Sequence, residues 1–411
     1  MKVRVLVSLV SAVLAPLILT ACQGGGSTGT NTSILTKIGT DPASVVAGAS
    51  FSDSIRVQVI DGSSNPKSGV SVAFAVTAGG GTVTPATVIT DANGKAAAKF
   101  MTGTTMGTNT ATATVTGLPA VTFSAATRFW SSASIGATYP LHSVWGTSAS
   151  DVWAVGNVGT ILHYNGTSWS SVSTGTMRYL WSVWASSASD VWAVGEFGTT
   201  LHYNGTSWSS VSIGTTQPLF AVWGTSTSDV WAVGSAGTIL HYNGTSWSSA
   251  SSATTQPLYG VGGTSASDVW AVACGGTILH YNGTSWSSAS IGTIPCLFSV
   301  WGSSPSDVWA VGENDLDASG LMLHYDGASW SSVSIGTTSM LWRVWGSSAS
   351  DVWAVGDRGF LHYNGTSWAA ASSVTPLNSV WGSSSSDVWA VGGCYFATDL
   401  CGTVFHGSPA G

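Results

Sequence analysis

From residue 141 to residue 406, short apolar segments alternate with turns rich in Gly, Ser, Thr, Asn and Asp. The first unit has four such segments, at Leu141–Gly146, Asp151–Gly156, Gly159–Tyr164 and Thr167–Val172. Each contains Val, Ile, Trp or Tyr and ends at turn residues, which is typical of antiparallel strands. The unit recurs, and its most constant part is the run Asp-Val-Trp-Ala-Val. This run begins at Asp151, Asp190, Asp229, Asp268, Asp307, Asp351 and Asp387.

The first five of these runs are spaced 39 residues apart. A period near 40 with four strands per unit predicts a β-propeller, and seven copies predict seven blades. Between the third and fourth strands, Asn165-Gly166 favours a type I′ turn, which needs positive φ at both positions. The repeated Trp residues, all from Trp130 onward, are expected to pack between neighbouring blades.

The seventh copy is split between the two ends of the repeat region. It has segments at Asp387–Gly392 and Gly402–His406 but no fourth segment, whereas an isolated strand-like segment, Phe129–Ser132, precedes the first unit. We therefore expect this segment to pair with the last blade and close the ring, since closure leaves only short protected strand edges.

The first 21 residues are typical of a bacterial export signal. A basic start, Met1–Arg4, precedes an apolar run at Val5–Leu19 that is too short to span a membrane. The next residues complete the string Leu-Thr-Ala-Cys22, which resembles the lipobox of bacterial lipoproteins. That resemblance implies cleavage before Cys22, a lipid on its thiol and, with Gln23 following, anchoring in the outer membrane on either side. A secreted protein cut nearby is the alternative.

Residues 22–33 are rich in Gly, Ser and Thr, which is typical of a flexible tether. Residues 34–127 contain no Trp, and their alternation and turn clusters predict a small β-sandwich. This segment resembles a bacterial immunoglobulin-like module of the invasin/intimin type, which implies a spacer that holds a binding domain away from the cell. The resemblance lies in Val57–Asp61, Asn65-Pro66, Gly69–Phe74, Thr90–Gly94 and Ala111–Thr116. Residues 128–411 form the propeller.

The propeller region is acidic and poor in charge. It has no Lys, four Arg, twelve Asp and two Glu, a net charge of −10, and only 7% of the whole chain is charged. This balance excludes an electrostatic surface for nucleic acid or anionic lipid. A neutral surface of Ser, Thr, Gly and Asn suits polar ligands such as glycans, and it equally suits a spacer.

Five Cys are present, and assigning Cys22 to the lipid leaves an even number for an oxidising compartment. Cys394 and Cys401 flank the loop between the second and third strands of the seventh unit. Cys274 lies in the same loop of the fourth unit, and Cys296 lies in the connection to the fifth. Because such loops emerge on one propeller face, we expect Cys274–Cys296 and Cys394–Cys401 disulfides there. Zinc is the alternative, but the spacings fit no usual ligand pattern; we expect no metal and no cofactor.

Departures from the repeat gather on that same face, which we call the variable face. It carries insertions at 313–319 and 394–401, and the residue after the second strand varies, with acidic Glu196 and Asp357 among its members. At the start of the first strand, one position is mostly aromatic, and a small residue follows it except at Arg343. The aromatic position reads His142, Trp181, Phe220, Tyr259, Phe298, Trp342 and Asn378. Such a ring near the axis stacks on sugars or holds a peptide; filling space between blades is the alternative.

No enzymatic activity is expected. The Asp of each repeated run and the His of each third strand, such as Asp151 and His163, recur with the unit and are interpreted as structural. Catalysis needs one asymmetric constellation instead. Glycoside hydrolysis needs two placed carboxylates, and nothing fixes a separation among the acidic residues of the variable face. A glycan-degrading enzyme is therefore the most remote alternative. The acidic segment 313–317 offers oxygen ligands for calcium or is a solvated loop.

Over residues 129–406, the repeat resembles tectonin-type lectin repeats, through a Val-Trp-x-Val strand and a Tyr-x-Gly-x-x-Trp hairpin. The resemblance implies the propeller fold and points more weakly to sugar binding. Two functions stay open. One is a lipid-anchored, adhesin-like or lectin-like protein that binds glycan or protein; the other is a structural or assembly scaffold of the outer membrane.

Overall fold

The computed structural model describes residues 33–39, 44–46, 54–103, 107–133, 135, 139–252, 254–289, 296–314, 319–335, 339–372, 376–393 and 402–409. Cys22, Cys394, Cys401 and residues 315–318 lie outside these ranges. The structure is all-β, with three short 3-10 turns as its helical elements among the residues described. Within the same ranges, no helix is long and apolar enough to cross a membrane.

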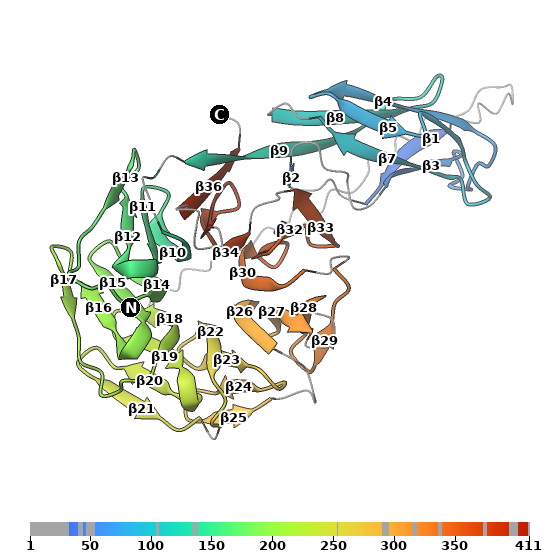
Figure 1. Cartoon of the computed structure of the whole chain (residues 1–411). Coiled ribbons are helices and arrows are strands. Elements are labelled where there is room, and N and C mark those ends of the chain that lie inside the picture. Colours follow the sequence, from blue (N-terminus) through green and yellow to red (C-terminus); the bar gives the residue numbers. More distant parts are fainter. Residues whose placement is uncertain are drawn as a thin grey trace, which may run out of the picture.

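The N-terminal part is a two-sheet sandwich, as predicted (Figure 1). One sheet has the order β1 (Ile34–Ile38), β3 (Ile55–Ile60), β7 (Lys95–Thr102), β5 (Gly81–Thr84); the other has β6 (Thr87–Ile89), β4 (Ser71–Ala78), β8 (Gly107–Thr114), β9 (Val121–Ala133), with β2 (Ser44–Val46) parallel to β9. Alternate residues face inward, so that Val57 and Phe100 of one sheet meet Phe74 and Phe123 of the other in a single core.

The repeat region forms separate four-stranded antiparallel sheets, one for each of the first six units, with strands paired in chain order. Figure 1 shows these sheets arranged around a common centre. The first strand of each unit contacts the first strand of the next, and β34 contacts β10. The strands of units one to three are β10 (Leu141–Ser148), β11 (Asp151–Gly156), β12 (Ile161–Tyr164), β13 (Trp169–Ser171), β14 (Leu180–Ser187), β15 (Asp190–Gly195), β16 (Thr200–Tyr203), β17 (Trp208–Ser210), β18 (Leu219–Ser226), β19 (Asp229–Gly234), β20 (Ile239–Tyr242) and β21 (Trp247–Ala250).

The strands of units four to seven follow the same plan. They are β22 (Leu258–Ser265), β23 (Asp268–Ala273), β24 (Ile278–Tyr281), β25 (Trp286–Ser288), β26 (Cys296–Ser304), β27 (Asp307–Asn314), β28 (Ser319–Tyr325), β29 (Trp330–Ser332), β30 (Leu341–Ser348), β31 (Asp351–Gly356), β32 (Gly359–Tyr363), β33 (Trp368–Ser372), β34 (Leu377–Ser384), β35 (Asp387–Gly393) and β36 (Gly402–Pro409).

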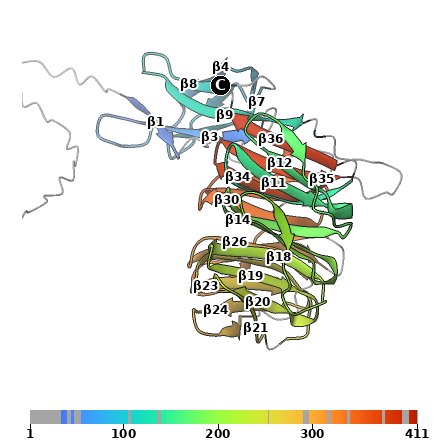
Figure 2. The same ribbon diagram turned by 90° about the vertical axis from the view of Figure 1, so that its left-hand side faces the viewer.

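One strand, β9, belongs to both the sandwich and the seventh unit. It pairs with β8 on one side and antiparallel with β36 on the other, where Trp130 lies opposite Gly407 and Ser132 opposite Phe405. Figure 2 shows β9 and β36 side by side. The strand β36 continues to Pro409, beyond its expected end at His406. Because β9 crosses the expected boundary at residue 128 without a break, a paired strand links the two parts.

Tryptophans of the second strands are buried between units, as predicted. Trp153 packs against the next unit, with ring centroids 5.1 Å from Tyr203 and 5.4 Å from Trp208. The same contacts recur around the region, and the seventh unit makes them with the first, where Trp389 lies 5.4 Å from Trp169. The repeated aromatic residues therefore form the interfaces on which the arrangement depends.

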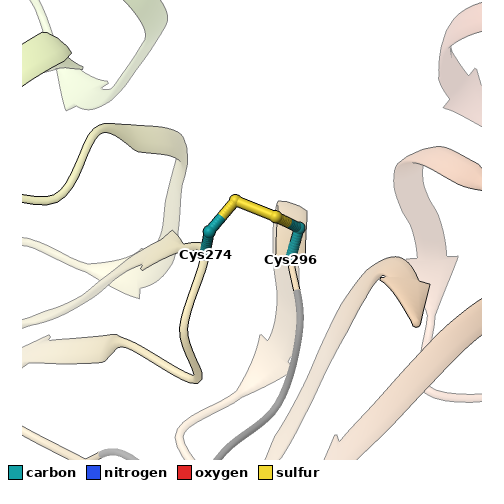
Figure 3. Close-up of a disulfide and its surroundings, with 2 residues drawn as sticks. All are labelled: Cys274 and Cys296. Atoms are coloured by element: carbon teal, nitrogen blue, oxygen red, sulfur yellow. A yellow bond between two sulfur atoms is a disulfide. The ribbon is translucent and has the colours of Figure 1, made fainter. Parts of the chain in front are cut away.

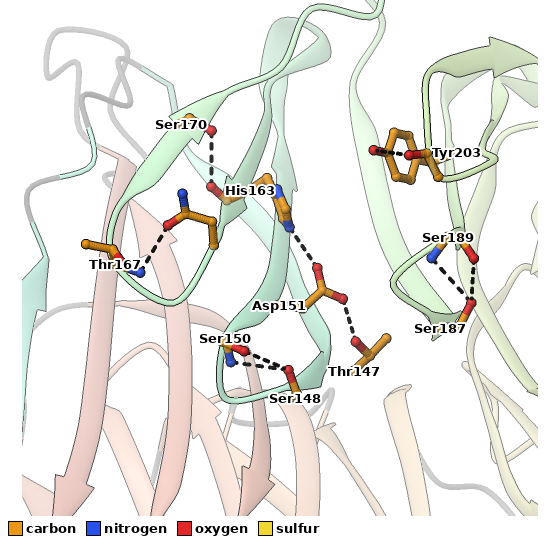
Figure 4. Close-up of polar contacts among 12 residues, drawn as sticks. Thr147, Ser148, Ser150, Asp151, His163, Thr167, Ser170, Ser187, Ser189 and Tyr203 are labelled. Atoms are coloured by element: carbon orange, nitrogen blue, oxygen red, sulfur yellow. Dashed lines mark hydrogen bonds and ion pairs between the residues drawn. The ribbon is translucent and has the colours of Figure 1, made fainter.

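A polar network joins the strands within each unit (Figure 4). In the first unit, Nε2 of His163 donates to Oδ1 of Asp151 at 2.7 Å, and the Thr147 hydroxyl donates to Oδ2 at 2.5 Å. The His163 ring also stacks on Trp153, 4.0 Å between centroids. Burial raises the pKa of Asp151, but the hydrogen bonds from His163 and Thr147 outweigh it, and the pKa lies below 3.8. The repeated Asp and His residues thus act together in the scaffold.

The turn prediction at Asn165-Gly166 is wrong. Gly166 has φ 91°, but Asn165 is not among the described non-glycine residues with positive φ. Its Oδ1 instead accepts the backbone N–H groups of Thr167 and Ser168, both at 3.0 Å, which closes the turn without positive φ at Asn. Left-handed pairs of residues occur on the variable face, at Val158 (φ 54°) and Gly159 (φ 66°) between the second and third strands.

Candidate functional site

The predicted aromatic positions come together around one cavity, which we call the bowl. Its volume is about 340 Å³. Each of the seven first strands contributes the residue that follows its first leucine, because the repeat places the same register position of every unit at the same distance from the centre. The lining residues are His142, Trp181, Phe220, Tyr259, Phe298, Trp342, Arg343 and Asn378.

Four pairs of neighbouring rings in the bowl contact each other. The centroid distances are 4.5 Å for His142–Trp181, 5.2 Å for Phe220–Tyr259, 5.7 Å for Tyr259–Phe298 and 4.8 Å for Phe298–Trp342. Every one of these side chains is half-buried. The rings therefore contact their neighbours across units and also border open space, which is the arrangement a ligand pocket requires.

Several polar groups of the bowl already have partners. Nε2 of His142 lies 2.5 Å from Oδ1 of Asn157, and the indole N–H of Trp342 donates to Asp357 at 2.8 Å. The amide of Asn378 donates to a backbone carbonyl at 2.8 Å. Burial, together with the charge of Arg343, lowers the pKa of His142 below 6.5, against the opposing hydrogen bond to Asn157. His142 is therefore neutral at neutral pH. Asp357, expected as a ligand contact, lies outside the lining and orients Trp342.

Arg343 stands where the other units have a small residue. It lines the bowl and also a smaller cavity of about 60 Å³. Desolvation lowers the pKa of Arg343 to about 10. Among the described residues, no hydrogen bond or ion pair engages its guanidinium. The corresponding Ser182 instead accepts the backbone N–H of Val222 at 3.2 Å, which ties unit two to unit three.

An exposed apolar surface adjoins the bowl at units one and two. Met177 is 77% exposed and Phe197 60%, and the guanidinium of Arg178 lies 4.5 Å from the Phe197 ring centre. Tyr179 meets the bowl residue Trp181 edge-on at 5.9 Å. We call Met177, Arg178, Tyr179 and Phe197 the Phe197 patch. Sequence reasoning missed it, although Met-Arg-Tyr replaces the Thr-Gln-Pro of the next two connections.

Glu196 and the cysteines are the remaining residues expected on the variable face. Glu196 does not line the bowl; its carboxylate accepts the backbone N–H of the patch residue Tyr179 at 3.2 Å. Cys274 and Cys296 form a disulfide with an S–S distance of 1.97 Å, which links unit four to the first strand of unit five (Figure 3). Cys394, Cys401 and most of the candidate calcium segment lie outside the described residues, and the described ones hold no group of three potential metal ligands.

Comparison with known proteins identifies both folds. Residues 31–129 match the family described as Invasin, domain 3. No curated protein matches the chain. A solved structure described as YCF48 bound to D1 peptide is similar, with a TM-score of 0.56 and 15% identity over 69% of this chain and 95% of that one.

Two other structures support the same conclusion. YCF48 from Cyanidioschyzon merolae has a TM-score of 0.53 and 15% identity over 67% of this chain and 98% of that one. The WD40 β-propeller domain of Doa1 has a TM-score of 0.56 and 15% identity over 69% of this chain and 98% of that one. The chain therefore combines an immunoglobulin-like module with a β-propeller.

Proposed function

We propose that this chain is a binding protein of the bacterial cell envelope and that the bowl is its ligand site. The observation that carries the proposal is the convergence of one position from all seven units on a single cavity of about 340 Å³, lined mainly by half-buried rings. That volume falls in the range of small-ligand sites, and most such sites are lined by apolar and aromatic residues.

A protein or peptide ligand is favoured over a glycan. The YCF48 neighbour is described with a bound peptide, and the exposed Phe197 patch next to the bowl is the kind of surface that contacts a polypeptide. The tectonin resemblance supports a glycan instead. An assembly scaffold for envelope proteins would use the same patch, and no catalytic role is proposed.

The test compares the full chain, purified in mild detergent, with a triple variant on glycan and peptide arrays. Trp181→Ala, Tyr259→Ala and Trp342→Ala together should abolish binding to the ligands of the native chain. Tyr139→Ala, which removes an exposed ring outside the bowl lining, serves as the control and should bind normally. Undiminished binding by a folded triple variant would remove the bowl from the function.

We also propose that the seven units form a closed seven-bladed ring with β9 as the last outer strand. Support comes from the pairing of β9 with β36 and from the contact of β34 with β10. An experimental structure viewed along the axis should show seven sheets without a gap. A gap between units one and seven, or another number of sheets, would refute the closure.

For localisation, we propose that Cys22 carries a lipid that anchors the chain in the outer membrane, while the sandwich spaces the propeller from it. The lipobox-like sequence at residues 19–22 supports this. Cells fed an alkyne fatty acid should label the native chain and not Cys22→Ser, which should be released from membranes. Equal labelling of both would contradict the assignment. Protease treatment of intact cells then reports which side the propeller faces.

A further inference from the structure

Arg343 is the one permanent cation among the residues that line the bowl. Its lowered pKa reflects a charge that has lost much of its hydration, and among the described residues no carboxylate pairs with it. This is unusual in a region whose net charge is −10. A partly desolvated guanidinium without a counterion is unfavourable, and a bound anion relieves the cost through charge-assisted hydrogen bonds.

The remaining polar groups of the bowl are poorly suited to a neutral sugar. A sugar presents several hydroxyl groups that need partners once buried. In the bowl, however, Nε2 of His142 is hydrogen-bonded to Oδ1 of Asn157, and the indole N–H of Trp342 donates a hydrogen bond to Asp357. What the lining offers is mostly apolar ring faces, the Tyr259 hydroxyl and one positive charge, that of Arg343. A ligand that matches it has a carboxylate next to an apolar group.

The Phe197 patch indicates how such a ligand is presented. It continues the bowl surface outward, because Tyr179 contacts Trp181 and Arg178 lies over Phe197. Phe197 occupies the left-handed turn position that Val158 and Ala236 hold in units one and three, and its ring is 60% exposed there. A small free acid would occupy the bowl without using this patch, whereas a polypeptide would cover both.

We propose that the bowl captures the C-terminal end of a polypeptide. The terminal carboxylate pairs with Arg343, the last side chain packs among the rings, and the preceding residues cross the Phe197 patch. This proposal rests on the proposed function, since it uses the same cavity, and it specifies the ligand class. The proposal makes the chain a protein that recognises polypeptide C-termini rather than a lectin.

The experiment is a calorimetric titration of the full chain in mild detergent. The probes are the hexapeptide Ala-Ser-Thr-Val-Ala-Phe as free acid, the same peptide as C-terminal amide, the dipeptide acid Ala-Phe, and glucuronate. The hexapeptide acid should bind at least about tenfold more tightly than the amide, because only the acid forms the charge-assisted pair. Glucuronate should bind far more weakly than either peptide acid.

Variants separate the two parts of the contact. Arg343→Gln should remove the preference for acid over amide, and Arg343→Lys should restore part of it. Arg358→Gln removes an exposed arginine of the same unit outside the lining and should change nothing. Phe197→Ser should weaken the hexapeptide acid but leave the dipeptide unchanged. Val158→Ser, at the equivalent turn position of unit one, is its control.

Each outcome decides the proposal. Equal affinity for acid and amide, an acid preference that survives Arg343→Gln, absence of peptide binding, or glucuronate binding as tight as the peptide acid would each overturn it. If the hexapeptide acid and amide bind equally and the triple aromatic variant binds neither, the bowl is still a binding site, and only the proposed recognition of the terminal carboxylate is refuted. The array experiment with the triple variant tests separately whether the bowl is the ligand site.

Discussion

Asp229→Asn removes the charge from one scaffold network without changing its size. Oδ1 of Asp229 accepts Nε2–H of His241 at 2.7 Å, and Oδ2 accepts the Thr225 hydroxyl at 2.5 Å. The Asp229 side chain is only 13% exposed. An amide offers one acceptor oxygen in place of two, so one donor loses its partner. A hydrogen bond to a charged group contributes about 1.5–3 kcal/mol; we expect a loss of about 2 kcal/mol in the free energy of unfolding.

Urea unfolding of the full chain, followed by tryptophan fluorescence, measures this loss. Burial raises the pKa of Asp229, but the bonds from His241 and Thr225 outweigh it and hold the pKa below 3.8. The unfolded carboxyl therefore takes up its proton first as the pH falls. The contribution of Asp229 is complete above about pH 4 and is lost as the pH falls through the folded pKa. The deficit of D229N should be full near neutral pH and shrink in strong acid.

Asp326→Asn is the matched control within the same chain. Asp326 occupies an exposed turn position where five other units have Asn, and its Oδ1 accepts the backbone N–H groups of Ala328 and Ser329. An Asn oxygen makes the same contacts at Asn165. The control should change stability by less than about 0.5 kcal/mol. A D229N variant as stable as the native chain, or a deficit independent of pH, would refute the reasoning.

Three further predictions concern contacts between units, all measured by the same unfolding assay. Ser182→Ala leaves the buried backbone N–H of Val222 without its acceptor and should lower the free energy of unfolding by about 1–2 kcal/mol. Ala221→Ser, at the equivalent position of the next unit, should raise it by about 0.5–1 kcal/mol. Equal effects of the two variants would contradict this reasoning. Gly262→Trp introduces the residue that most units carry at this position. It should nevertheless destabilise the fold by about 1–3 kcal/mol, because even a Cβ would lie 2.5 Å from the backbone oxygen of Val300 in unit five. A stabilised variant would show that units four and five are packed less tightly than this. Replacing Cys274 and Cys296 by Ser removes a disulfide between residues 22 positions apart and should lower the free energy of unfolding by about 3 kcal/mol. An unchanged stability would mean that the disulfide does not constrain the unfolded chain.

The sequence predicts well whatever depends on local periodicity. The strand order, the burial of Trp153 and its equivalents, and the pairing of the segment around Trp130 with the last unit all follow from counting repeats. The same logic put His142 and its six equivalents near one another, because equal register positions in a repeat must face the same way.

What the sequence could not predict depends on how side chains meet in space. The turn at Asn165 was misjudged because a side-chain oxygen replaced the backbone conformation that Asn-Gly usually signals. The Asp151–His163 hydrogen bond joins two strands whose residues were interpreted separately. Their spacing of 12 residues in each of the first four units was a signal. The open volume of the bowl, and the absence of a partner for Arg343 among the described residues, depend on the radius of the whole arrangement.

The most direct test of the bowl as the ligand site is a crystal structure of the full chain with the hexapeptide acid. The result we predict has the terminal carboxylate within about 3 Å of the Arg343 guanidinium and the last side chain between Trp181, Tyr259 and Trp342. Peptide bound on the opposite face, or between two units with the bowl unoccupied, would contradict the assignment.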